Sequence, residues 1–326
     1  MDRRDSLGLI CATLAAPALV YAQSAGKVAR IAYLSPLSAD SGRTWLAAFR
    51  AGLKERGYIE GRNVVIDVRY ADGKLERLPA LAAELARAKP DIFVAYGQDA
   101  VRAADRATST VPVVISNTQD PVASGLVTNL ARPGGKITGM SDFHAASTTK
   151  RLQLLKETLP GLSRVAVFWR PANVPHVEQL KDLRLAARGL GVAILPLEIN
   201  KPEDIEPAFA TMRKERAGAL LMLGESVLTA NMSRIVELSL KSGIPAMYTA
   251  PIFAQRGGMI SYGTDIGDLC RRAAGHVDKI LKGAKAGDLP IELPTKFELA
   301  VNLSAAKALG VSIPRSILLR ADKVIE

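Results

Sequence analysis

The chain has 326 residues, of which 48% are hydrophobic and 23% are charged, and its formal net charge is +11. This length and composition suffice for two globular domains and exclude a disordered protein. The lysines and arginines are spread among acidic residues and form no basic arm, zinc motif or aromatic-basic pattern. We therefore expect a solvated basic surface and no nucleic-acid partner.

Residues 1–22 have the pattern of an export signal peptide. Arg3 and Arg4 precede an apolar run over residues 7–20 that is too short to span a bilayer, and Ala22 offers a small residue for cleavage. The arginine pair also loosely resembles a twin-arginine signal. A frayed N-terminal helix is the alternative. With a signal peptide, we expect the protein to be periplasmic.

The next part of the chain alternates between short apolar strands and amphipathic helices. The pattern predicts strands at residues 28–35, 64–70, 91–96, 111–116 and 137–140, and helices at residues 40–57, 75–89 and 100–108. This βαβαβαβ series is typical of a parallel sheet covered by helices.

A second series starts at residues 164–171, Arg-Val-Ala-Val-Phe-Trp-Arg-Pro, which repeat the pattern of the first strand. Further strands are predicted at residues 192–199, 219–223, 246–248, 258–262 and 297–302. Helices are predicted at residues 145–159, 174–190, 202–216, 227–242, 252–256, 265–282 and 304–309, and the tail containing Pro314 is expected to be irregular. Two such series favour two α/β lobes with a ligand cleft between them over one long α/β domain.

The fold class that we predict is α/β, with two doubly wound parallel-sheet lobes joined by three hinge segments. Residues 27–141 and 264–286 are assigned to lobe one, and residues 142–263 and 287–326 to lobe two. Three crossings let each lobe stay rigid while a few residues absorb the rotation that opens and closes the cleft.

The candidate ligand-binding residues follow from one rule, that ligands of open α/β sheets bind at the carboxyl ends of the strands. The rule selects Ser35, Gly97, Gln98, Ser116, Asn117 and Asp120 from lobe one, and Trp169, Asn173, Glu225, Tyr248 and Tyr262 from lobe two.

The polar candidates each have a structural alternative. Free backbone N–H groups at Gly97 could hold a carboxylate, or this residue could form a plain tight turn. Asp120 could receive an ammonium group, but an Asp-Pro pair also caps helices. Glu225, at a predicted strand end, could be a ligand contact or a surface residue.

The aromatic candidates have the same ambiguity. Trp169 and Tyr248 could stack on a flat or aromatic ligand, although core packing competes with this role. Tyr262 lies beside a predicted crossing, where it could instead pack the hinge.

Motifs of enzymes and cofactor sites are missing from the sequence. His144, His176 and His276 lie on separate predicted elements without the spacing of metal ligands. There is no nucleophile elbow, phosphate-binding loop or dinucleotide fingerprint. After removal of the signal, Cys270 would be the only cysteine, which excludes an internal disulfide. We expect a binding protein without catalytic activity, cofactor or metal.

Nine stretches, spread over nearly the whole chain after the signal, resemble one family. Residues 48–63 read Ala-Phe-Arg-Ala-Gly-Leu-Lys-Glu-Arg-Gly-Tyr-Ile-Glu-Gly-Arg-Asn, and residues 130–135 read Leu-Ala-Arg-Pro-Gly-Gly. The other stretches are residues 77–85, 120–122, 137–139, 261–263, 278–284, 294–299 and 318–322. In this order they are similar to the periplasmic substrate-binding proteins of ABC transporters, in the subfamily that includes tryptophan- and tyrosine-type binders.

This resemblance implies a type I periplasmic-binding fold and a specific function. The expected protein is a monomer that captures a small molecule, such as an amino acid or a related carboxylate, and delivers it to an ABC permease in the inner membrane with its ATPase. Gln98 stands where the family often has a small hydroxyl residue, so the specificity could differ from that of relatives. A ligand-sensing domain that feeds a signalling partner is the alternative. A DNA-binding helix-turn-helix at the N-terminus would favour this alternative, but the predicted signal peptide occupies that place.

Overall fold

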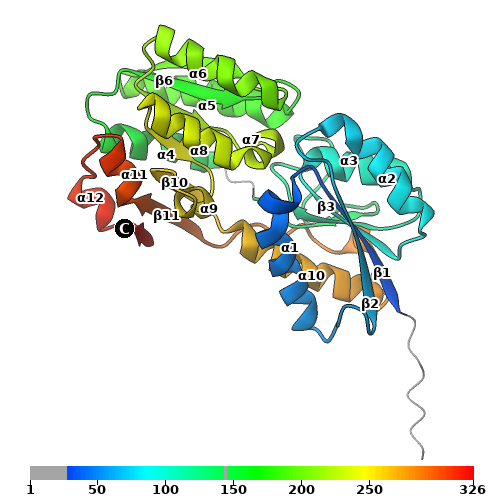
Figure 1. Cartoon of the computed structure of the whole chain (residues 1–326). Coiled ribbons are helices and arrows are strands. Elements are labelled where there is room, and N and C mark those ends of the chain that lie inside the picture. Colours follow the sequence, from blue (N-terminus) through cyan, green and yellow to red (C-terminus); the bar gives the residue numbers. More distant parts are fainter. Residues whose placement is uncertain (1–27, 143–144) are drawn as a thin grey trace, which may run out of the picture.

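The computed structural model describes residues 28–142 and 145–326. They form two α/β lobes that lie side by side, with the C-terminus in the second lobe (Figure 1). The predicted signal peptide and His144 lie outside the described residues.

The first lobe is built on a five-stranded sheet with the order β2-β1-β3-β4-β5, and all of its strand pairs are parallel. Its strands are β1 (Ala29–Ser35), β2 (Val64–Tyr70), β3 (Ile92–Tyr96), β4 (Val113–Asn117) and β5 (Ile137–Gly139). In this order the switch point, where ligands bind in doubly wound sheets, lies between β1 and β3.

Helices cover both faces of the first sheet. They are α1 (Ala39–Lys54), α2 (Leu78–Arg87), α3 (Gln98–Ala107) and α10 (Ile266–Leu281). Alternation along β1 sends Ile31 and Tyr33 to the core under α1 and α10, and Ala32 and Leu34 to the core under α2 and α3. Helix α10 carries Cys270, a buried free thiol.

The second lobe is built on a seven-stranded sheet with the order β12-β11-β10-β9-β8-β6-β7. Its strands are β6 (Arg164–Trp169), β7 (Ala193–Glu198), β8 (Ala219–Met222), β9 (Ala246–Tyr248), β10 (Ile260–Thr264), β11 (Phe297–Asn302) and β12 (Lys323–Ile325). Strand β11 runs antiparallel to β10, and every other pair of neighbouring strands in this sheet is parallel.

The helices of this lobe are α4 (Ala145–Thr158), α5 (Val174–Gly189), α6 (Ile205–Lys214), α7 (Ser226–Ala230), α8 (Met232–Ser242), α9 (Pro251–Gln255), α11 (Leu303–Ala308) and α12 (Arg315–Leu318). Alternation along β6 again divides the core. Val165 and Val167 pack with α4 and α5, and Ala166 and Phe168 pack with α6 and α8.

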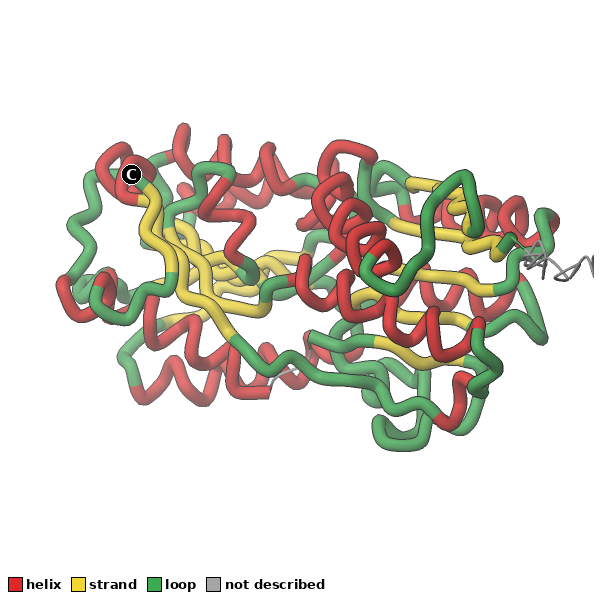
Figure 2. The backbone as a smooth tube through the Cα atoms, turned by 90° about the horizontal axis from the view of Figure 1, so that it is seen from below, coloured by secondary structure: helices red, strands yellow, loops and turns green. Residues whose placement is uncertain are grey.

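The chain passes between the lobes between β5 and α4, between β10 and α10, and between α10 and β11. In Figure 2, loops run from one lobe to the other. The prediction of two doubly wound lobes joined by three segments is therefore confirmed. Glu292 N donates to Gly139 O and Ser141 N donates to Glu292 O, each at 2.9 Å. We propose on this basis that lobe one extends to Glu292 rather than to residue 286.

Two local predictions were wrong. The helix predicted over residues 227–242 is two helices that meet at Asn231, whose side chain donates to Val227 O at 2.8 Å and ends α7. The tail is not wholly irregular, because residues 323–325 pair with β11 as an edge strand. Three residues are too few to form a recognisable strand pattern.

Candidate functional site

The first lobe contributes residues at the carboxyl ends of β3 and β4, beside the switch point. Tyr96 ends β3, and Gly97 turns the chain into α3. Gly97 has a φ of +78°, which glycine adopts without strain. Asn117 ends β4 and is followed by Thr118 and Gln119.

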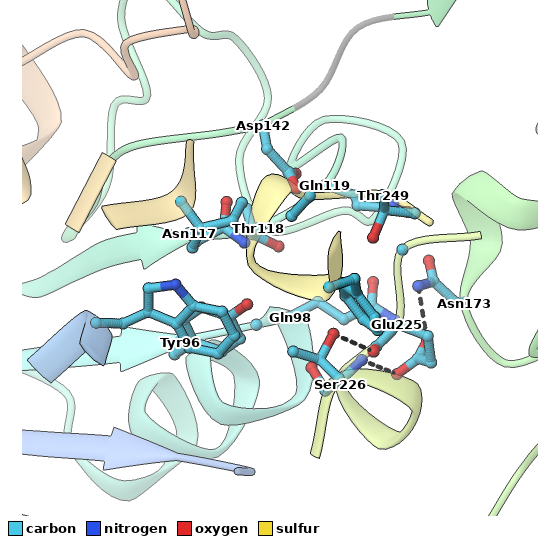
Figure 3. A pocket seen from close by; sticks show the side chains of 17 residues that line it. Tyr96, Gln98, Asn117, Thr118, Gln119, Asp142, Asn173, Glu225, Ser226 and Thr249 are labelled. Carbon is cyan, nitrogen blue, oxygen red and sulfur yellow. Dashed lines mark hydrogen bonds between the residues drawn. The ribbon is translucent and has the colours of Figure 1, made fainter. Parts of the chain in front are cut away.

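The second lobe faces these residues with the carboxyl ends of its own strands (Figure 3). Asn173 follows β6, Gly224 and Glu225 follow β8, and Thr249 follows β9. Together the two lobes line a cavity with about 580 Å³ of space that protein atoms leave free, part of which is open to solvent.

One wall of the cavity is aromatic. Trp45 of α1 and Tyr96 stack with ring centroids 5.2 Å apart and an interplanar angle of 11°. Phe253 of α9 also lines the cavity. Trp45 is only 3% exposed, so this part of the wall is itself almost completely removed from water.

The polar lining contains buried oxygens without a hydrogen-bond partner in the described chain. They are Asn117 Oδ1, Thr118 Oγ1, Asp142 Oδ1 and Asn173 Oδ1. A buried oxygen without a hydrogen-bond partner costs free energy. A ligand that donates hydrogen bonds to these oxygens would remove this cost. Burial raises the pKa of Asp142 to about 7, although Arg151 and Asn117 act to lower it.

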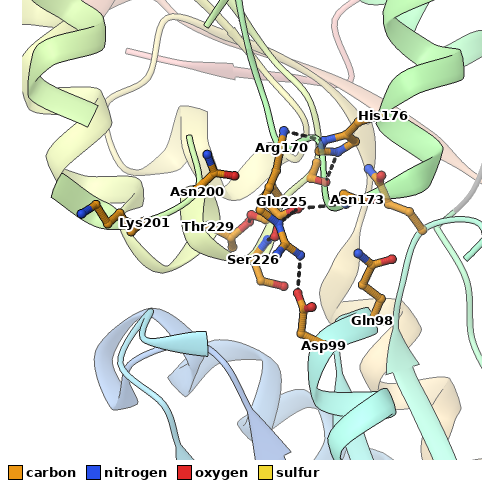
Figure 4. A network of polar contacts seen from close by, with 12 residues as sticks. Gln98, Asp99, Arg170, Asn173, His176, Asn200, Lys201, Glu225, Ser226 and Thr229 are labelled. Carbon is orange, nitrogen blue, oxygen red and sulfur yellow. Dashed lines mark hydrogen bonds and ion pairs between the residues drawn. The ribbon is translucent and has the colours of Figure 1, made fainter. Parts of the chain in front are cut away.

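A buried ionic network fixes the rim of the cavity in the second lobe (Figure 4). Arg170 Nε lies 3.1 Å from Glu225 Oε2, and Asn173 Nδ2 donates to the same oxygen at 2.9 Å. Burial acts to raise the pKa of Glu225, but Arg170, His176 and Asn173 outweigh it and hold this pKa below its ordinary value. Glu225 is therefore an ionised carboxylate with its charge already balanced.

His176 connects the loops that follow β6 and β8. Its Nδ1 accepts from Arg170 N at 3.0 Å, so its Nε2 donates to Gly224 O at 2.9 Å. Burial lowers the pKa of His176, which keeps the ring neutral in this role. The histidine thus positions the two loops that carry Asn173 and Glu225.

Contacts across the cavity show that the lobes are closed on each other. Arg170 forms an ion pair with Asp99 of α3. A Cβ atom on Gly97 would lie 2.5 Å from Ser226 Oγ, and a Cβ atom on Gly224 would lie 2.3 Å from Gln119 Nε2. Glycines at both positions therefore allow the two lobes to approach.

Five of the predicted site residues line this cavity: Gly97, Gln98, Asn117, Asn173 and Glu225. Gln98 is held in place because its Oε1 accepts from Ser124 Oγ at 2.9 Å. At these five positions, the residues predicted from the strand ends lie together in one cavity.

Three predicted polar residues lie outside the cavity lining because they serve the backbone. Ser35 Oγ accepts from Leu37 N at 3.2 Å, and Ser116 Oγ donates to Ala95 O at 3.3 Å. Asp120 Oδ1 accepts from Val122 N and Ala123 N at 3.0 and 2.9 Å, which makes it a cap.

Three predicted aromatic residues also lie outside the cavity lining. Trp169 packs on the side of β6 that faces α4 and α5. Tyr248 is fully buried and stacks on Phe253 at 4.9 Å, and Tyr262 stacks on Phe297 at 6.0 Å. Side-chain alternation in each strand turns these rings toward the helices rather than toward the strand end.

Several cavity residues were missed by the sequence reasoning. Tyr96, Thr118 and Thr249 are immediate neighbours of predicted residues, and a wider window at each strand end would have included them. Trp45 lies within the helix predicted over residues 40–57, and the rule of strand ends does not consider helix residues. Asp142 lies in the first crossing, for which the sequence offers no strand-end signal.

No group of histidine, cysteine and acidic side chains in residues 28–142 and 145–326 could hold a metal ion. Among the helices of these same residues, none combines the length and the apolar character needed to cross a membrane.

A cavity lined from both sides by strand ends of two α/β lobes defines a two-lobed binding protein. The model of the family "ABC transporter substrate binding protein" matches residues 30–325, and the chain belongs to this family. This family consists of binding proteins and not of enzymes, as expected from the sequence.

Individual relatives agree with this assignment. The chain is 24% identical over 263 residues to the tyrosine-binding protein of Clostridioides difficile (strain R20291), which covers 81% of this chain and 75% of the relative. A conserved domain protein from Vibrio cholerae has a TM-score of 0.84 at 26% identity, over 91% of this chain and 100% of that one.

A third comparison is with an ABC domain from Streptococcus pneumoniae in complex with L-Trp. It has a TM-score of 0.83 at 24% identity, over 91% of this chain and 99% of that one. The type I periplasmic-binding fold expected from the sequence is confirmed by these neighbours and by a leucine-binding protein of the same architecture.

Proposed function

We propose that this protein captures an aromatic amino acid, or a related small carboxylate, between its lobes and delivers it to an ABC importer. The observation that carries the proposal is the combination of an aromatic wall and unpartnered acceptors in one cavity between the lobes. A flat apolar ring and a primary ammonium group match these two features.

Recognition of the ammonium group rests on oxygens from both lobes. Asn117 Oδ1 and Asp142 Oδ1 belong to the first lobe and its crossing, and Asn173 Oδ1 belongs to the second lobe. An ammonium group has three donors and no acceptor, so it can satisfy three such oxygens at once. It would also supply the counter-charge for the Asp142 carboxylate.

Recognition of the ring rests on Trp45 and Tyr96. Stacked or tilted aromatic contacts add about 0.5–1.5 kcal/mol to the free energy gained by removing the ring from water. Relatives support this ligand class, because one is named a tyrosine-binding protein and another is in complex with L-Trp. In this chain Gln98 adds an amide to the lining that could alter which ring is preferred.

Delivery to an importer follows from the family. The closed form would present both lobes to a permease in the inner membrane, which a separate ATPase drives. A ligand that binds the closed form more tightly than the open form shifts the equilibrium toward closure. The N-terminal export pattern fits a periplasmic location for this step.

The test is a thermal-shift screen of the purified protein, followed by calorimetry. The panel contains the standard L-amino acids, aromatic acids without an amino group, and sugars. At a concentration of 100 times Kd a ligand stabilises by about 2.7 kcal/mol, so tyrosine or tryptophan should raise the melting temperature by several degrees. Stabilisation by sugars alone, or by none of the amino acids, would contradict the proposal.

A further inference from the structure

A second cavity continues from the first and contains a buried arginine. The two cavities share Gln119, Asp142, Gly224 and Thr249 in their linings. Arg151 of α4, together with Thr148 and Gln179, lines only the second cavity. A ligand that passes Asp142 would therefore reach Arg151.

The guanidinium group of Arg151 has an unused donor, and the acidic group that acts on its charge is Asp142, whose own pKa is raised to about 7 by burial. This residue is only 5% exposed. Its Nη2 donates to Thr148 Oγ1 at 2.8 Å and its Nη1 to Tyr262 O at 3.3 Å, and both acceptors are neutral. Its Nε is buried and has no acceptor in the described chain. A buried cation is costly unless an anion accompanies it.

The first cavity is unsuited to an anion. The charged side chains in its lining are Asp142 and Glu225, both acidic. The N-terminus of α3 at Gly97 is approached by Ser226, since a Cβ on Gly97 would lie 2.5 Å from Ser226 Oγ. The second cavity is therefore the better place for a negative group of the ligand.

We propose that Arg151 binds a carboxylate of the ligand in the second cavity, with Asp142 at the junction beside the ammonium group. This inference rests on the proposed function, because it assigns the two charged ends of an amino acid to two connected cavities. It predicts that the site selects free acids over their neutral amides. Arginine suits this task, since its planar fork can hold both carboxylate oxygens.

The experiment measures the Kd of L-tyrosine, L-tryptophan and their primary amides by calorimetry. The variants are R151Q and, as a matched control, R184Q, which replaces an exposed arginine of α5. The wild type should bind the acids roughly 10- to 100-fold more tightly than the amides, as expected for hydrogen bonds to a charged group. R151Q should lose this preference by weakening the acids only, and R184Q should retain it.

A second variant covers the case in which R151Q does not fold. R151K keeps the positive charge but loses the planar fork, so it should bind the acids roughly tenfold more weakly while the amides are unaffected. Unchanged acid affinity in either variant, or equal wild-type affinity for acids and amides, would overturn the Arg151 site and leave the amino-acid receptor intact.

Failure of the proposed function can be distinguished from failure of the Arg151 site. If the wild type binds no amino acid, the proposed function fails. The Arg151 site is then tested with two acids that lack an amino group, phenylacetate and 4-hydroxyphenylpyruvate. Binding of either acid that R151Q removes would support the anion site. Binding of neither acid would overturn it together with the proposed function.

Discussion

Arg170, just after β6 in the second lobe, forms an ion pair with Asp99 of α3 in the first lobe. The same guanidinium places its Nε 3.1 Å from Glu225 Oε2, within its own lobe. One side chain thus joins the rim of the cavity to the opposite lobe. The pair to Asp99 exists only while the lobes are closed, whereas the pair to Glu225 does not depend on closure.

D99N should weaken the closed form without unfolding the protein. Asp99 retains partial exposure, and Arg170 keeps Glu225 as its counter-charge when Asp99 is neutralised. We expect ligand affinity to fall roughly tenfold, the size of one charge-assisted hydrogen bond, in a calorimetric titration. D182N, which neutralises an exposed acid on α5, is the control and should bind as the wild type does. Wild-type affinity in D99N would show that the pair contributes nothing to closure.

R170M should act differently, because it leaves the buried Glu225 carboxylate without its cation. Removing one partner of a buried pair costs about 3–5 kcal/mol, and chemical denaturation of the ligand-free protein should report a loss of this size. If R170M and D99N have the same free energy of unfolding, the distinction between the two halves of the network is wrong.

G97A should impair closure more than an equivalent change elsewhere. Gly97 and Gly134 both have a φ of +78°, so alanine is strained at both positions. A Cβ at position 97 would also lie 2.5 Å from Ser226 Oγ of the other lobe, whereas at position 134 the nearest atom is 3.9 Å away. We expect similar melting temperatures for the two variants but at least tenfold weaker binding for G97A, measured by calorimetry. Equal affinities would argue against contact between the lobes at this point.

The two tryptophans of the chain should report binding differently. Trp45 lines the cavity, and Trp169 packs against the helices of the second lobe. The change in tryptophan fluorescence on adding L-tyrosine should persist in W169F and disappear in W45F. The reverse result would place the ligand near Trp169 and restore that residue as a site residue.

Asp142 should make binding and stability depend on pH between about 4 and 7. Burial raises its pKa from 3.8 to about 7, so the folded protein holds a proton that the unfolded chain releases. The free energy of unfolding of the ligand-free protein should therefore fall as the pH rises through this range, relative to that of D142N. Affinity for an ammonium ligand should rise over the same range, because the carboxylate forms.

D142N serves as the control for this titration. The affinity of D142N should be weaker than that of the wild type at pH 8 and should not change between pH 5 and 8. Because both proteins contain His176 and His276, subtracting the two pH profiles removes the contributions of these histidines. Parallel pH profiles for the wild type and D142N would exclude Asp142 from ligand binding.

The lobes and part of the site were predictable because both follow from chain periodicity. Short apolar runs between amphipathic helices predict a parallel sheet, and the ends of its strands predict Gly97, Asn117 and Asn173 in one cavity. These features are local in the sequence. The alternation of side chains within a strand, which turns Trp169 toward the core, is also local. However, which face of the strand Trp169 lies on relative to the core is known only once the helices have been placed.

Other features depend on contacts between distant segments. Asp142 and Arg151 meet Gln119 and Thr249 only after both lobes have folded and closed. The ion pair of Arg170 with Asp99 joins residues 71 positions apart on different lobes. Residue spacing in a single sequence does not identify such pairs, because their side chains meet only when the two lobes are positioned against each other.

In the proposed mechanism, a ligand bridges the two lobes and holds them closed. Small-angle X-ray scattering of the protein, without ligand and with a saturating amino acid whose binding calorimetry has established, tests it most directly. We expect the radius of gyration to decrease on binding, and D99N to show a smaller decrease at subsaturating ligand. An unchanged radius of gyration in the saturated wild type would contradict capture by lobe closure.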